Sequence, residues 1–140
     1  MASLAEIRAA VKATLEAAIS GVTCYDTVPD SINAPAIIVA PATADFTTAM
    51  ARGADRWEFD LIPIVRMADP IVAQTELDAY VTGAGPRSIR AAVYADRTLG
   101  RGDVDAHVRG LSNYGSRYDV AGVDYTGATL RLVVVTTGTA

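Results

Sequence analysis

Residues 56–65 alternate between apolar and charged side chains, and this alternation constrains the fold more than any other feature of the chain. A strand turns successive side chains to opposite faces of a sheet, so this strand has one apolar and one charged face. The apolar face carries Trp57, Phe59 and Leu61, and the charged face carries Arg56, Glu58 and Asp60. We expect the apolar face to lie on a core under a helix. Pro63 lacks an N–H donor and predicts an edge position or a bulge.

Three segments have the signals of helices that could cover such a sheet. The first is predicted over about 4–19, because Ser3 and Glu6 have capping-box spacing and Gly21 suits the end of a helix. Its apolar stripe consists of Leu4, Ile7, Val11, Leu15 and Ile19. Asp69 and Pro70 open the second helix, which has a stripe of Ala73, Leu77, Tyr80 and Val81 and closes at Gly83. The third starts at Gly85-Pro86 and runs through Ile89, Ala92 and Val93.

The other segments are predicted as strands and connections. Strands are expected over 22–26, over the apolar run 36–40 between two prolines, over the alternating residues 104–109, over 117–123 with a break at Gly122, and over the Val-rich residues 130–136. Connections are expected as a turn at 28–30, an irregular loop over 42–54, a polar turn at 110–115 and a flexible tail over 136–140. The order α-β-β-β-α-α-β-β-β predicts one α+β domain over residues 1–140, with a mixed or antiparallel β-sheet flanked by two to three helices.

Composition narrows the functional class. A chain of 140 residues with 51% hydrophobic and 20% charged residues suits one globular domain and excludes disorder throughout. The net charge of −4 argues against a general nucleic-acid binder held by phosphate contacts. Cys24 is the single cysteine, so an internal disulfide and a cysteine-built zinc site are excluded. Glu6 and Arg8 interrupt the apolar run that a signal peptide needs, and no apolar stretch of 18 residues exists, so no membrane partner is expected.

Motifs for a cofactor or a nucleophile are near misses. Residues 83–88 lack the third glycine of a dinucleotide-binding loop and follow a helix, so we interpret them as the end of one helix and the start of the next. Residues 110–115 are one residue too long for a nucleophile elbow, and strand parity places His107 and Ser112 on opposite faces. Cys24 is interpreted as a small buried hydrophobe and not as a nucleophile. These residues predict no catalytic function and no cofactor.

Two groups of charged residues have the types of side chain that could bind a metal. Asp103, Asp105, His107 and Arg109 fall on one face of one strand. Alternate residues of a strand stand about 7 Å apart, which is too far for one ion, so we favour a solvated or partner-facing polar strand over a metal site. For Glu58 and Asp60 we likewise favour an exposed face shared with Arg56.

Several segments along almost the whole chain, taken in order, carry a family resemblance. After the first helix come Tyr25–Asp30, the strand Pro35–Pro41, the Arg52-Gly53 loop, the strand Trp57–Asp60, the pair Ala73–Tyr80 and Ser88–Ala92, a strand with Tyr118, and the Val-rich strand. In this order they resemble the tail-terminator (tail-completion) proteins of long-tailed bacteriophages (siphophages), especially those of actinobacterial hosts. No single motif is diagnostic; the order of the features carries the resemblance.

The resemblance implies a structural virion protein and not an enzyme. Such subunits form a homo-oligomeric ring, usually a hexamer, which caps the finished tail tube, stops its polymerisation and presents a surface for head–tail joining. The implied partners are further copies of the chain, the tail tube protein and the head–tail connector, with DNA passing through the ring without specific binding. The implied location is the neck-proximal end of the virion tail, after assembly in the host cytoplasm. The candidate partner contacts are Phe46, Met50 and Arg52, which are in the predicted loop.

Two alternatives stay open at the level of the sequence. The first is a neck or stopper protein of the same phage machinery, which is another small ring-forming adaptor. The second, which we rank lower, is a small-molecule-binding α+β enzyme domain. Imaging separates them, because a ring supports the phage proteins and a monomer with a pocket supports the enzyme.

Overall fold

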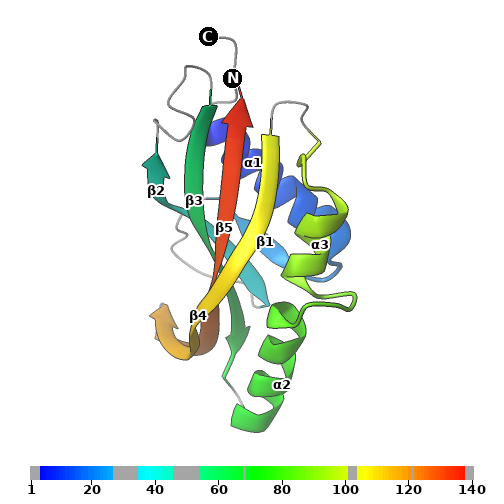
Figure 1. Cartoon of the computed structure of the whole chain (residues 1–140). Helices are drawn as coiled ribbons and strands as arrows, with labels where there is room; N and C mark the ends of the chain where they lie inside the picture. Colours follow the sequence, from blue (N-terminus) through cyan, green and yellow to red (C-terminus); the bar gives the residue numbers. More distant parts are fainter. Residues whose placement is uncertain are drawn as a thin grey trace.

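The elements that the sequence predicts assemble into a mixed sheet and three helices (Figure 1). The computed structural model describes residues 4–26, 35–45, 54–67, 69–100, 104–120 and 122–137. The elements in chain order are α1 (Leu4–Ala18), β1 (Thr23–Tyr25), β2 (Ala36–Asp45), β3 (Ala54–Arg66), α2 (Pro70–Val81), α3 (Ile89–Ala95), β4 (Val104–Val120) and β5 (Val123–Thr137). This arrangement confirms the predicted α+β class.

The sheet has the strand order β1-β2-β3-β5-β4, so β1 and β4 form its two edges. β1 runs parallel to β2, and every other neighbouring pair is antiparallel. α1 packs on β1 and β2, α2 on β3 and β5, and α3 on β4, so the helices cover one face of the sheet (Figure 1). The other face carries no helix of the described chain, as the charged side of the β3 pattern requires.

The helix ends follow local capping chemistry. α1 buries Ile7, Val11 and Leu15, as its apolar stripe predicts. α2 begins where predicted, because the Asp69 carboxylate accepts a hydrogen bond from the Ile71 N–H at 2.9 Å. The predicted start of α3 at Gly85-Pro86 is wrong. The helix begins at Ile89, because the Ser88 hydroxyl accepts from the Ala91 N–H at 3.1 Å and supplies the cap.

β3 is an interior strand, and its two faces differ as the alternation predicts. Phe59 and Leu61 are fully buried on the helix side, and Trp57 is half-buried against the same cluster. The predicted edge position or bulge at Pro63 is wrong. Leu61 pairs with Leu130 and Ile64 with Gly127 in one unbroken register, so the proline only leaves a gap in the ladder between β3 and β5.

Three predicted boundaries are corrected by the extent of the strands. β2 continues to Asp45 through a register shift between Pro41 and Thr43, so residues 42–45 are strand and not loop. β3 already begins at Ala54, and residues 46–53 lie outside the described residues, as does the turn predicted at 28–30. Thr136 is fully buried in β5 and therefore does not belong to a flexible tail, and residues 138–140 lie outside the described residues.

β4 is one strand of 17 residues where the sequence predicts two strands and a turn. The register with β5 shifts twice, between Val108 and Gly110 and between Ser112 and Ser116. At the second shift, the residues predicted as a polar turn form a bulge within the strand. In this bulge Asn113 and Gly115 take φ angles of 52° and 79°. The described residues therefore form one strand fewer than the expected order, because β5 pairs with β4 on both sides of the bulge.

Candidate interaction surfaces

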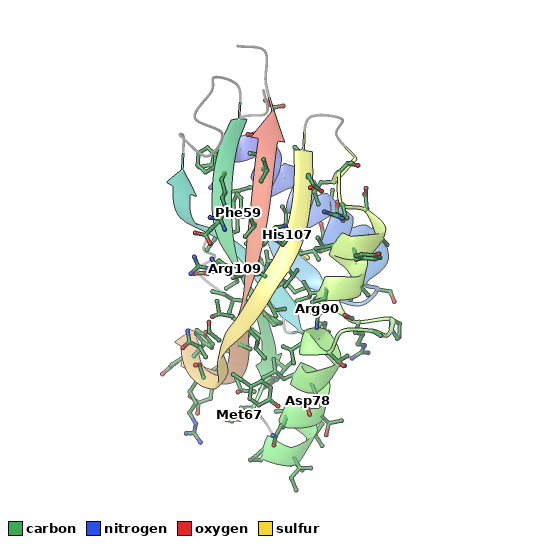
Figure 2. The ribbon with its side chains drawn as sticks, viewed as in Figure 1. Phe59, Met67, Asp78, Arg90, His107 and Arg109 are labelled. Carbon is green, nitrogen blue, oxygen red and sulfur yellow. The ribbon has the colours of Figure 1, made fainter. Side chains whose placement is uncertain are left out.

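Three arginines converge on two carboxylates on the helix-free face of the sheet. Glu58 lies 3.0 Å from Arg109, 3.8 Å from Arg56 and 3.9 Å from Arg131. Asp60 lies 3.0 Å from Arg131. The residues come from β3, β4 and β5, which the register brings side by side, and Figure 2 labels Arg109 on β4. Glu58 and Asp60 share this face with Arg56 as predicted, but the face is not exposed as expected: all three side chains are half-buried, because the arginines of the neighbouring strands cover the carboxylates.

An arginine also pairs with a carboxylate of β4. Asp105 lies 3.2 Å from Arg97, which follows α3. Asp105 and His107 are exposed, and Asp103 lies outside the described residues. In the described part of the chain, no group of three or more His, Cys, Asp or Glu side chains is placed to hold a metal ion. A metal site at Asp105 and His107 therefore gains no support, and the interpretation as a polar strand accounts for the ion pair of Asp105.

His107 and Ser112 share a face, so the parity argument from the sequence is wrong. The bulge at Val108/Gly110 inserts one residue and reverses the alternation beyond it. His107 pairs with Val133 and Ser112 with Thr129, four positions apart on β5. Four strand residues span about 14 Å, so the imidazole cannot act as a base on the Ser112 hydroxyl.

A groove runs along the free edge of β4, where α3 faces the strand. One part has a volume of about 420 Å³ and is lined by α3 residues including Arg90 and Tyr94 and by Ala106, His107 and Val108 of β4. A second part of about 280 Å³ continues along β4 to Leu111. Arg90 and Val108 line both parts, so we treat them as one surface, the β4-edge groove. Figure 2 labels Arg90 of α3 and His107 of β4, which are among the lining residues.

Large apolar side chains are exposed near this edge and at the start of α2. Tyr94 is 78% exposed, and Leu111 and Tyr114 are also exposed. Tyr114 donates a hydrogen bond to Asp78 of α2, and this bond is the main cause that raises the pKa of the Tyr114 phenol. Ile71 and Val72 form a separate exposed pair on α2. Exposed aromatic and aliphatic residues of this size are typical of contact surfaces.

The residues considered as nucleophile or cofactor motifs have structural positions. Cys24 is buried in β1, and burial raises the pKa of its thiol to about 12, so it stays protonated. The interpretation of Cys24 as a buried hydrophobe is confirmed. Residues 83–88 connect α2 to α3, as expected for a helix end followed by a helix start.

The predicted contact residues Phe46, Met50 and Arg52 lie outside the described residues, so they remain predictions. Sequence reasoning missed Arg90 and the β4-edge groove. Arg90 lies off the apolar stripe of α3, which is a weak signal for exposure. The groove itself has no signal in the sequence, because its two walls are separated along the chain and meet only after folding.

Comparisons with known proteins add no family to this description. No protein-family model matches the chain, and a search of curated proteins finds no significant relative. No helix in the described part of the chain is long and apolar enough to cross a membrane.

Proposed function

We propose that this chain is the subunit of a bacteriophage tail-terminator ring, which caps the finished tail tube and offers a surface for head–tail joining. The observation that carries the proposal is the resemblance described above, in which helices, Pro-bounded strand, charged strand and Val-rich strand follow one another over almost the whole chain. The α+β fold found here is the fold class that the resemblance implies.

The arrangement of the sheet is compatible with ring formation. β1 and β4 are the two edges of the sheet, so the subunit has different surfaces at its two ends. A contact between unlike surfaces is heterologous, and such contacts generate a closed ring when the rotation closes. The exposed Tyr94, Leu111 and Tyr114 near the β4 edge supply apolar contact area of the kind found in interfaces.

The charge of the subunit supports passage of DNA without binding. The net charge of −4 gives a ring that does not attract phosphates overall. On the helix-free face, Arg109 and Arg131 already have carboxylate partners in Glu58 and Asp60. Their charge is therefore partly neutralised within the subunit.

The test is a phage in which the gene for this chain is deleted. We expect full heads and separate tails, some of them of abnormal length, because uncapped tubes continue to add subunits. Expression of the wild-type chain in trans should restore joined virions with tails of uniform length. The His107→Ala variant is the matched control and should restore them equally, because the His107 side chain lies on the helix-free face, opposite to Leu111, and a surface histidine contributes little to stability.

Tail length separates this proposal from its alternative. A neck or stopper protein acts after the tube is finished, so its loss leaves unjoined tails of normal length. Unjoined tails of uniform normal length, or joined virions in the deletion phage, would overturn the terminator assignment. Electron microscopy of the particles measures both the joining and the tail length.

A further inference from the structure

The free edge of β4 leaves backbone groups directed away from the sheet. The Ala106 N–H donates to the Arg97 carbonyl oxygen at 2.7 Å, which lies outside the ladder between β4 and β5. Alternation along a strand then directs the N–H and C=O of Val108 outward as well. The bulge after Val108 inserts one extra residue, so the next residue whose N–H and C=O point away from β5 is Leu111 and not Gly110.

Apart from the Ala106 N–H, these outward groups have no backbone partner in the part of the chain that the structure describes. Among the described residues, the Ala106 N–H makes the one backbone hydrogen bond that residues 104–112 form outside the sheet ladder. The Ala106 carbonyl and both backbone groups of Val108 and Leu111 therefore face the β4-edge groove. A row of free donors and acceptors on an edge strand is a template for one more strand. The Arg97 carbonyl occupies the edge at Ala106, so the free edge runs from Val108 to Leu111. It spans two positions of β5, or about 7 Å, which suits the central residues of a short added segment.

The groove is cationic, although the protein as a whole is acidic. Arg90 lines both parts of the groove and makes no ion pair with any residue that the structure describes. Arg97 and Arg109 flank it, and their partners Asp105 and Glu58 satisfy one charge each. Among the described residues, the Arg90 guanidinium therefore has no carboxylate partner, and it faces the groove from α3, where a side chain of an added strand could reach it.

We propose that the β4-edge groove binds an extended acidic segment of a partner polypeptide, which adds to the sheet as a strand beside β4. The backbone of Val108 and Leu111 supplies the main-chain hydrogen bonds, and Arg90 pairs with a carboxylate of the segment. The exposed Tyr94 covers the apolar side chains of the segment. This proposal concerns peptide binding by the isolated chain and goes beyond the tail-terminator function, so either can fail without the other.

The test uses two labelled peptides of five residues, Glu-Val-Glu-Val-Glu and Lys-Val-Lys-Val-Lys, with both ends blocked. Fluorescence anisotropy with the purified full chain measures the affinity of each at low salt. We expect the acidic peptide to bind at least tenfold more tightly than the basic one. Backbone amide shifts in an NMR titration should move at residues 106–111, because new hydrogen bonds form there.

Two substitutions with matched controls separate the charge from the strand addition. Arg90→Glu should weaken binding of the acidic peptide at least tenfold, whereas Arg87→Glu, which makes the same charge change outside the groove lining, should leave it within twofold. Leu111→Pro removes an outward N–H, which is not part of the ladder with β5, and should weaken binding at least tenfold, whereas Leu111→Ala keeps this donor and should leave it within about threefold. Circular dichroism and thermal unfolding show whether each variant keeps the fold, and the NMR titration of the wild type tests the proposal without any variant.

Several results would overturn the proposal. They are the failure of the wild type to bind the acidic peptide, equal binding of the basic peptide, and unchanged affinity of a folded Arg90→Glu or Leu111→Pro variant. A self-associated wild type that Leu111→Pro converts to monomer would also overturn it, since a second copy of the chain would then occupy the edge. Light scattering measures this last outcome.

Discussion

Gly127 of β5 lies so close to Pro63 of β3 that a Cβ on Gly127 would stand 2.6 Å from the Pro63 carbonyl oxygen. The same Cβ would lie 2.9 Å from the ring of Tyr118. Gly127 pairs with Ile64, directly after the gap that Pro63 leaves in the ladder. The absence of a side chain on Gly127 therefore allows β3, β4 and β5 to stay in contact at this point of the sheet.

Replacing Gly127 with alanine should destabilise the fold by about 1–3 kcal/mol, because the backbone of β3 must shift to admit the new methyl group. Gly110→Ala is the matched control, since a Cβ there meets no atom within 4 Å. Urea unfolding followed by circular dichroism measures both free energies. Equal stability of the two variants would show that the sheet accommodates a side chain at position 127 without strain.

Glu58→Gln should destabilise the protein by about 1 kcal/mol, because Arg56, Arg109 and Arg131 then lose the carboxylate that they share. Added salt should reduce the loss, since it screens the repulsion between the arginines. Asp105→Asn provides the comparison: its pair with Arg97 is exposed, so the change should stay within about 0.5 kcal/mol. Thermal or urea unfolding at low and high salt tests this, and a Glu58→Gln loss no larger than the Asp105→Asn loss would contradict it.

Alkaline pH should destabilise the protein through Cys24. Burial raises the pKa of this thiol from 9.0 to about 12, so the unfolded chain loses its proton first as the pH rises. The stability from this group is fully present below pH 9 and is lost between pH 9 and about 12, by up to about 1.4 kcal/mol per pH unit. The Cys24→Ala variant should lose less stability over this range. Burial also raises the pKa of Tyr80, and the charge of Cys24 adds to this rise, so the difference between the two unfolding curves measures Cys24 together with its effect on Tyr80. Identical pH profiles of the two proteins would refute the assignment.

Deleting residues 45–51 should leave separate heads and tails in complemented phage while the subunit still folds. The deletion removes Phe46 and Met50, the apolar residues predicted to contact the partner, and Arg52 adjoins it. Circular dichroism of the purified variant tests the fold, and electron microscopy of the particles tests the joining. Ile71→Ala, which shortens an exposed apolar residue elsewhere, serves as the control for a general loss of surface. Normal virions from the deletion variant would show that residues 45–51 are not part of the contact surface.

Local signals predicted the helices and the faces of the strands. The Asp69 cap and the stripe of α1 depend on residues within a few positions of one another, so they are readable from the chain alone. The alternation of Phe59 and Leu61 with charged residues is equally local, and both are buried as expected. The start of α3 differs from the prediction at Gly85-Pro86, because Ser88 has the side-chain hydrogen-bond acceptor that Gly85 lacks.

The sequence by itself therefore determined the fold class, the core face of β3, and the positions of α1 and α2. Only the tertiary structure decided that β3 is interior, that β4 is one strand, and that His107 and Ser112 share a face. It also decided that Arg90 and Val108 form one groove. The physical reason is that strand order, register and bulges depend on hydrogen bonds between segments far apart in the chain, and a one-residue bulge reverses the faces of all residues beyond it.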